Sequence, residues 1–171
     1  MNQYQIDEIR EKVKKVLSEE RYKHTLGVMN TAKELAECYG EDVEKALVAG
    51  LLHDCAKHIS TNLLHAKDGA LLAREEYGVM DSYITDAIRY HTTGRPKMTL
   101  LDKIIYVADY IEPNRDKAPN LANLRQMAFQ NIDECLYRIL EDTLEYLKIK
   151  NRDIDPTTEE TYLYYKNEMQ K

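Results

Sequence analysis

The chain has 171 residues, of which 43% are hydrophobic and 32% charged, and its formal net charge is −6. Its length and apolar content suffice for one domain, over residues 1–171, whose core needs no disulfide or structural zinc. The negative charge disfavours broad, non-specific binding to nucleic acid, which usually depends on a basic surface.

Apolar residues recur at helical intervals along most of the chain, and no run alternates with the period of two typical of strands. The periodicity predicts helices over about 6–17, a segment that reaches Cys38, 42–52, 60–77, 81–90, 100–111, 132–147 and 156–169. Asp42, Ser60 and Asp81 are expected N-caps, whereas 91–96 and 113–118 are expected loops. We therefore predict an all-α helical bundle, in which the penultimate helix is the longest amphipathic one.

The dipeptide His53-Asp54 ends an apolar run over 46–52, and Asp109 is the first acid in a second apolar run that a proline stops. A buried histidine or carboxylate without a partner is costly, and a cation supplies a partner. The competing interpretation of His53-Asp54 is a capped helix end with a satisfied histidine. Two buried acids with an adjacent histidine favour a shared metal ion.

His24 lies in the middle of the second predicted helix and completes a set of two histidines and two carboxylates with His53, Asp54 and Asp109. A lone helical histidine is more often structural than a ligand, but here three separate helices can each present a residue to one centre in the bundle core. Such ligands suit iron or manganese, or less specifically zinc or magnesium, and leave about two positions open at an octahedral ion. A bound water then has a lowered pKa, so the implied chemistry is hydrolysis.

Four strings carry a family resemblance: His24, then Leu-Leu-His-Asp-Cys-Ala-Lys over 51–57, Tyr-His-Thr-Thr-Gly-Arg over 90–95, and Ala-Asp-Tyr-Ile-Glu-Pro-Asn-Arg over 108–115. Together they resemble the HD-domain phosphohydrolase superfamily, and more closely its YqeK-type symmetrical diadenosine tetraphosphate hydrolases. The resemblance runs from about residue 21 to 165. It implies a single HD domain with a metal-binding core at about 21–115 and C-terminal helices over 120–171.

The resemblance also implies cytoplasmic hydrolysis of diadenosine tetraphosphate into two ADP, with iron bound by His24, His53, Asp54 and Asp109. Manganese or magnesium are alternative ions. The positions that it implies for nucleotide contacts are Arg21, Lys57, His65, His91, Thr92, Arg115, Arg152, Asp153, Ile154, Asp155, Pro156 and Thr157. Asp54, Lys57, His65 and His91 are the residues expected to take part in catalysis.

The residues themselves support part of this assignment. Arg21 lies one helical turn before His24, and Lys57 lies one turn after His53 if that helix persists, so each can place a cation beside the metal. Arg115 can present a planar fork to phosphate. The alternatives are a solvated helix-end charge for Lys57, an exposed loop side chain for Arg115, and a simple loop cap for Thr92. The tyrosines of the C-terminal segment are expected to pack in the core.

His65 and His91 leave three roles open. They can bind a second ion, donate to phosphate, or act as a general acid near the free pKa of imidazole. We favour the phosphate role, because the leaving ADP needs a proton or a cation and an imidazolium provides either. His58 lacks a partner in the pattern and is expected to face solvent.

The working hypothesis is that metal-bound hydroxide attacks an inner phosphorus, so that ADP leaves from each side. One alternative is another HD-type reaction, on a nucleoside triphosphate, a guanosine polyphosphate or a cyclic nucleotide. A second is a non-catalytic purine nucleotide sensor or a helical interaction module. Product analysis separates the hydrolases, and the intact ligand set argues against a sensor.

The three cysteines, Cys38, Cys55 and Cys135, are odd in number and form no C-x-x-C pair, which argues against disulfides and thiolate zinc. The usage fits a reducing cytoplasm. The amino end has no signal-peptide pattern, and no segment approaches the roughly 20 apolar residues of a membrane span. We expect a cytoplasmic protein without membrane or nucleic-acid partners, and a homodimer is possible from the hydrophobic, tyrosine-rich ends.

Overall fold

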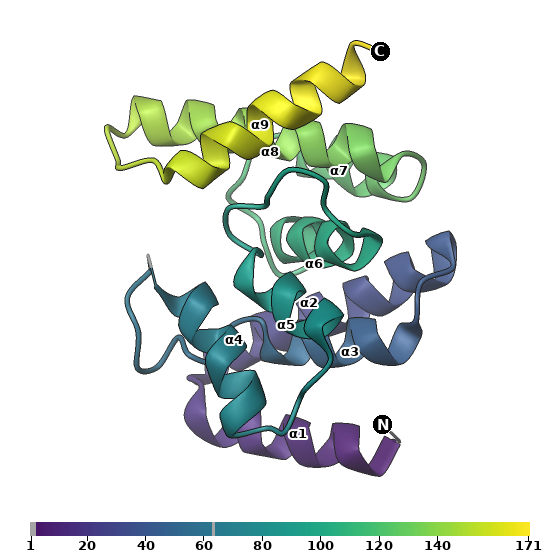
Figure 1. Ribbon diagram of the computed structural model, residues 1–171, viewed down its shortest axis with the longest axis vertical. Helices are drawn as coiled ribbons and strands as arrows, with labels where there is room; N and C mark the ends of the chain where they lie inside the picture. Colours follow the sequence, from purple (N-terminus) through teal and green to yellow (C-terminus); the bar gives the residue numbers. More distant parts are fainter. Residues whose placement is uncertain (1–2, 63) are drawn as a thin grey trace.

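The computed structural model describes residues 3–62 and 64–171, and within these ranges the chain forms nine α-helices and no strand (Figure 1). In chain order they are α1 (Gln3–Val16), α2 (Glu19–Tyr39), α3 (Val43–Leu52), α4 (His65–Glu75), α5 (Ser82–Arg89), α6 (Leu100–Ile111), α7 (Leu121–Ala128), α8 (Ile132–Ile149) and α9 (Pro156–Met169). The all-α prediction is confirmed. In the described part of the chain, no helix combines the length and apolarity needed to cross a bilayer.

Most helix ends follow from local chemistry. The side chains of Asp42 and Asp81 accept a hydrogen bond from the backbone N–H of Lys45 and Tyr83, so both are N-caps as expected. Gly40 ends α2 in the left-handed conformation, with φ of 76°. These signals are readable from the sequence because each depends on residues within one turn.

The predicted helix over 60–77 is wrong at its start. α4 begins at His65, and Ser60 is no N-cap, because its hydroxyl donates to the Asp68 carboxylate at 2.6 Å. The backbone over 53–59 forms successive turns instead, with hydrogen bonds such as that from Lys57 N to Asp54 O. The helix that ends at Leu52 therefore does not persist to Lys57.

Two further expectations are wrong. One concerns the stretch before α8, and the other concerns the place of His24 in α2. The short helix α7 lies in a stretch for which no helix was predicted, since eight residues give only two turns of apolar periodicity. α2, with 21 residues, is longer than α8, with 18, but it is less amphipathic, so α8 is the longest amphipathic helix as predicted. α2 begins at Glu19, so His24 lies near the start of its helix and not in the middle.

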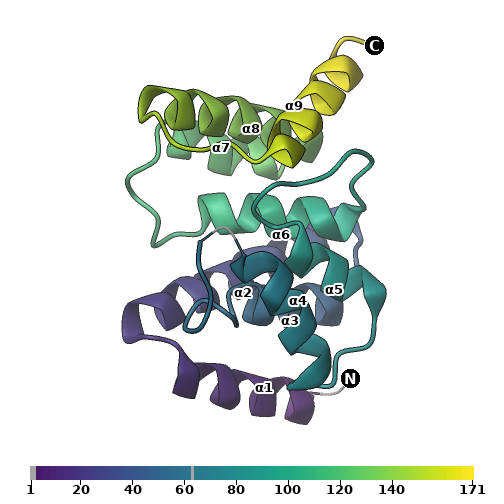
Figure 2. The ribbon, with the colours of Figure 1, turned by 60° about the vertical axis from the view of Figure 1, so that its left-hand side comes forward.

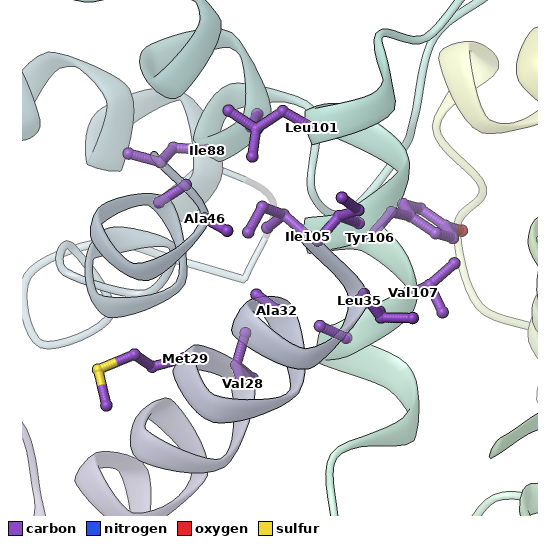
Figure 3. Packing of buried hydrophobic residues seen from close by; sticks show 14 of the residues in the cluster. Val28, Met29, Ala32, Leu35, Ala46, Ile88, Leu101, Ile105, Tyr106 and Val107 are labelled. Atoms are coloured by element: carbon purple, nitrogen blue, oxygen red, sulfur yellow. The ribbon is translucent and has the colours of Figure 1, made fainter. Parts of the chain in front are cut away.

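The helices stack in layers with α6 at the centre (Figures 1 and 2). On one side α6 packs against α2, α3 and α5, and on the other against α7 and α8, while α9 covers α8. Buried side chains from α2, α3, α5 and α6 meet between these helices, among them Val28, Ala46, Ile88 and Ile105 (Figure 3). Burying a valine or isoleucine side chain of this kind stabilises the fold by about 1.5–3 kcal/mol. This core fixes the helix ends from which the polar cluster projects.

Candidate metal centre and active site

The four predicted metal ligands meet at one point. His24 from α2 places Nε2 2.9 Å from Asp109 Oδ1 of α6. His53, directly after α3, places Nε2 3.2 Å from Asp54 Oδ2 and 3.5 Å from Asp109 Oδ1. Neighbouring ligands of an ion with bonds of about 2.1 Å lie about 3 Å apart, so these separations suit one shared cation. His53 and Asp54 are buried as expected, whereas 21% of the Asp109 side chain remains exposed.

Three histidines of the site are oriented by the same hydrogen bond, from Nδ1 of the ring to a nearby backbone carbonyl. The Nδ1 atoms of His53, His65 and His91 each lie 2.7–3.0 Å from the backbone carbonyl three residues earlier, which accepts the Nδ1–H. For His53 and His91 these carbonyls belong to the last turns of α3 and α5, where backbone acceptors lack a helical partner. With Nδ1 held by this hydrogen bond, Nε2 of each ring faces Asp54.

Asp54 lies between two pairs of histidines. Its Oδ2 faces His53 at 3.2 Å and His24 at 3.8 Å, while its Oδ1 faces His65 at 3.3 Å and His91 at 3.4 Å. Burial alone would raise the pKa of Asp54, but the surrounding imidazoles outweigh it and hold that pKa well below the usual value. The carboxylate is therefore ionised and available to both sides.

The first side of the cluster, formed by His24, His53 and Asp109 around Asp54 Oδ2, demands a cation. Burial lowers the pKa of His53, but the two carboxylates outweigh burial and raise it to about 10. His53 Nε2 is also buried without a hydrogen-bond partner among the described residues. A proton or a metal ion on this nitrogen satisfies both observations. The donor atoms of His24, His53 and Asp109 lie close enough together to hold one ion, as do those of His53, Asp54 and His91, and imidazoles with carboxylates fit a divalent ion.

The second side, formed by His65 and His91 around Asp54 Oδ1, has a different character. Both Nδ1 atoms donate to carbonyls, so both Nε2 atoms are acceptors when the rings are neutral, yet they lie 3.2 Å apart. Asp54 Oδ1 adds a third acceptor. Three converging acceptors require at least one proton or a cation among them.

Three basic side chains surround the first side. Arg21 Nη1 lies 3.2 Å from Asp54 Oδ2, and Arg115 donates from Nε and Nη2 to the Asp109 carbonyl at 3.2 and 3.0 Å. Lys57 reaches the site from a turn rather than a helix and donates to Asn62 Oδ1 at 3.0 Å. Burial lowers the pKa of Lys57, and the neighbouring Arg21 and Arg115 act in the same direction. These cations lie beside the carboxylates of Asp54 and Asp109, so the site combines both signs of charge.

An open cavity of about 360 Å³ adjoins this side, between the start of α2 and the segment after α6. It is lined by Glu20, Arg21, Lys23, His24, Glu112, Asn114, Arg115, Asp116 and Lys117. A larger groove, of about 560 Å³ between α7 and α8, contains none of the predicted site residues. The cavity beside the cluster therefore offers the space for a polyanionic ligand.

The remaining predicted contacts are not joined to the cluster. Thr92 is exposed in the loop after α5. Residues 152–155 connect α8 to α9, and Pro156 and Thr157 begin α9. The interactions found there among the described residues are local: Asp155 caps α9, and the Arg152 guanidinium lies 6.0 Å from the centre of the Tyr146 ring. This connection and the segment after α6 lie on the same side of the molecule (Figure 2, left). His58 is exposed and Tyr165 is buried, both as expected.

Sequence reasoning assigned no role to Glu112, a buried carboxylate that accepts a hydrogen bond from His24 Nδ1 at 2.7 Å. The available signal was an acid placed directly between an apolar helix and Pro113. His24 lies inside a helix whose carbonyls are already paired. Its Nδ1–H therefore cannot donate to the backbone carbonyl three residues earlier, as those of the other three histidines do.

Comparison with known proteins agrees with the geometry. The HD domain family model matches residues 21–114. Symmetrical bis(5'-nucleosyl)-tetraphosphatases from Bacillus subtilis (strain 168) and Halalkalibacterium halodurans are 45% and 43% identical to the chain, in each case over 88% of it and 91% of the relative. A crystal structure of a predicted HD superfamily hydrolase involved in NAD metabolism from Clostridium acetobutylicum has a TM-score of 0.91 and 37% identity, and covers 98% of this chain and 99% of that one.

Both the predicted fold and the predicted family are thereby confirmed. HD domains bind divalent metals, and the histidine–carboxylate cluster lies inside the matched range. The chain belongs to the HD-domain family and, within it, to the symmetrical bis(5'-nucleosyl)-tetraphosphatases.

Proposed function

We propose that the protein hydrolyses diadenosine tetraphosphate symmetrically into two ADP at a divalent metal ion held by His24, His53, Asp54 and Asp109. The observation that carries the proposal is the convergence of these four donors beside a cavity whose lining includes Arg21, Lys23, Arg115 and Lys117. The names of the relatives supply the substrate.

When bound, the ion would supply a lowered pKa of water and an electrophilic contact for a phosphate oxygen. We propose iron as that ion, with manganese or magnesium as alternatives, because imidazole and carboxylate ligands suit all three better than thiolate would. The nearby Cys55 does not compete for it, since its thiol is buried and donates to the Gly69 carbonyl.

The protein side chains orient the substrate and stabilise its charge. We propose that Arg21, Lys57 and Arg115 bind the phosphate oxygens, and that Thr92 and residues 152–157 contact the nucleoside ends. Arg21 and Arg115 line the cavity, and cations in this position would neutralise charge that develops as the phosphoanhydride breaks. Approach of the connection at 152–157 to the cavity would complete the nucleotide site.

The reaction adds one water to one inner phosphorus and breaks its bond to the central bridging oxygen. That oxygen leaves with the second ADP and needs a proton. We propose that the His65–His91 pair, which already requires a shared proton or cation, provides it. Asp54 Oδ1 contacts both histidines, and its Oδ2 faces His53. Asp54 therefore links the proposed proton donor to the side of the cluster that would hold the ion.

Product chromatography of the purified protein tests the proposal. Incubation with diadenosine tetraphosphate and added iron, manganese or magnesium is expected to yield ADP alone, while elemental analysis records the ion that copurifies. ATP plus AMP would contradict the symmetrical cut. Binding without turnover would favour a nucleotide sensor, and faster hydrolysis of a nucleoside triphosphate, guanosine polyphosphate or cyclic nucleotide would favour another HD reaction.

We further propose that the chain acts as a single HD domain in the cytoplasm and forms a homodimer. Three free cysteines support a reducing compartment. Exposed apolar side chains on the last two helices, including Ile149, Leu163 and Met169, support self-association. Light scattering after size exclusion measures the oligomeric state, and a mass of one chain would contradict the dimer.

A further inference from the structure

Glu112 is a buried acid that no predicted role accounts for. It directly follows α6, where its φ of −52° and ψ of 150° take it out of the helix. Pro113 disfavours the helical conformation of the preceding residue, so the helix must end here. The turn directs the Glu112 side chain into the protein, where only 1% of its surface is exposed.

Both carboxylate oxygens of Glu112 are used. Oε2 accepts the Nδ1–H of His24 at 2.7 Å, and Oε1 accepts the backbone N–H of Asn114 at 2.6 Å. With Nδ1 donating, His24 presents Nε2 toward Asp109. Glu112 therefore does for His24 what a backbone carbonyl does for His53, His65 and His91.

The α2 helix leaves space for this carboxylate at Gly27. A Cβ at Gly27 would lie 2.3 Å from Glu112 Oε1 and 3.1 Å from Asn114 Nδ2. Gly27 lies one turn after His24 and is buried within α2, where glycine lowers helix stability relative to alanine. A glycine at this helical position is explained by the approach of Glu112.

Arg125 of α7 holds the segment that carries Glu112. Its guanidinium donates to three backbone carbonyls, those of Ile111 at 2.7 Å, Glu112 at 2.9 Å and Arg115 at 2.6 Å. These contacts satisfy the end of α6 and tie it to the C-terminal helices. The position of the Glu112 carboxylate is thus set by the tertiary fold as well as by the local turn.

We propose that Glu112 is a positioning residue that fixes the tautomer and orientation of His24, and that Gly27 is required because it admits the Glu112 carboxylate. The inference depends on the proposed function only through the role of His24 as a metal ligand. It assigns Glu112 no contact with the substrate.

The test measures the affinity of the metal-free protein for Mn²⁺, by the loss of the free-ion signal in electron paramagnetic resonance. Glu112→Ala is expected to weaken Mn²⁺ binding about 10- to 100-fold, the usual effect of losing such a partner. Glu112→Gln keeps an oxygen acceptor of the same reach and is expected to retain part of the affinity. Wild-type affinity in Glu112→Ala would overturn the proposal.

Gly27→Ala gives a second route that keeps the carboxylate in the chain. Its methyl group is expected to displace Glu112 and to reproduce the loss seen in Glu112→Ala, although alanine favours the helix. The double variant Gly27→Ala/Glu112→Ala is expected to bind no more weakly than Glu112→Ala alone. Wild-type affinity in Gly27→Ala, or fully additive losses, would overturn the role given to Gly27.

Asp102→Asn is the matched control. Asp102 is also a buried acid of α6, but it pairs with Arg95 at 2.8 Å and caps its own helix. We expect Asp102→Asn to lower thermal stability while Mn²⁺ affinity stays within about threefold, since it does not touch His24. An equal loss of affinity in this control would assign the Glu112 effect to general destabilisation. The Mn²⁺ measurement uses no nucleotide, so its failure is distinguishable from failure of the proposed hydrolysis, which the product analysis tests.

Discussion

The two sides of the Asp54 carboxylate differ in their balance of charge. The first side joins His24 and His53 to a second carboxylate, Asp109, and is bordered by Arg21. Among the described residues, the second side has two histidines, His65 and His91, and Asp54 is the only acid that pairs with them. The first side is therefore suited to a divalent ion, whereas the second is suited to a single positive charge, such as a proton.

This difference indicates different roles for the two sides, with metal binding on the first side and proton donation on the second. Two carboxylates would offset the charge of a divalent ion held on the first side. The His65–His91 pair, whose Nε2 atoms converge with Asp54 Oδ1, needs a proton or a cation among its three acceptors. The predictions below separate the two sides, from the largest expected effect to the smallest.

Asp54 belongs to both sides, so its removal is expected to have the largest effect. Asp54→Ala should lose the ion and lower kcat/KM about a thousandfold, because an ion supplies several kcal/mol of stabilisation to the transition state. Asp109→Asn should lower it less, since only the first side is changed. Steady-state kinetics at a fixed metal concentration make the comparison, and activity within tenfold of wild type in both variants would rule out the metal mechanism.

His91→Ala is expected to separate proton donation from metal binding. Loss of a general acid lowers kcat about 10²- to 10⁴-fold, while the first side should still bind one ion per chain. His53→Ala serves as the reference, because it should lose the ion as well. If elemental analysis finds two ions per chain in the wild type and one in His91→Ala, the second side binds a metal instead.

Lys57→Ala is expected to weaken substrate binding rather than metal binding. A charge-assisted hydrogen bond to phosphate contributes about 1.5–3 kcal/mol, so kcat/KM should fall roughly 10- to 100-fold with unchanged metal content. Lys67, which is exposed on α4, gives the control variant Lys67→Ala, for which no change is expected. An unchanged kcat/KM in Lys57→Ala would indicate that Arg21 and Arg115 bind the phosphates without Lys57.

Proton release on metal binding gives the smallest effect for a change of one pH unit. Burial lowers the pKa of His53, but Asp54 and Asp109 outweigh it and raise the pKa to about 10 in the metal-free protein. His53 is then protonated at neutral pH, and an ion must displace that proton. The apparent affinity should rise by up to tenfold per pH unit and level off near pH 10.

The same shift has a consequence for the metal-free fold. Because the folded pKa of His53 exceeds the unfolded value near 6.5, its contribution to stability is complete below about pH 6.5 and is lost as pH rises toward 10.

Calorimetry of metal binding in buffers of different ionisation enthalpy counts the protons that metal binding releases. A count of zero at pH 7 would contradict the protonated state of His53.

Short-range patterns in the chain were sufficient to predict the helical class and several helix ends. Asp42, Asp81 and Gly40 act on the backbone within one turn, so their roles can be read without the fold. Ser60 has the same sequence signal but a different partner, Asp68. Helix α7 escaped prediction because its two turns carry too few apolar positions to establish a period.

By itself, the sequence determined which residue types could bind the ion and which family they indicate, since both depend on residue identity and order. Only the tertiary structure decided how those residues face one another. Residues 85 to 88 positions apart, such as His24 with Asp109 and Glu112, meet because α2 and α6 pack together, and the space at Gly27 has meaning only in that packing. Hydrogen bonds and close contacts between helices depend on distances in space, which a one-dimensional pattern does not contain.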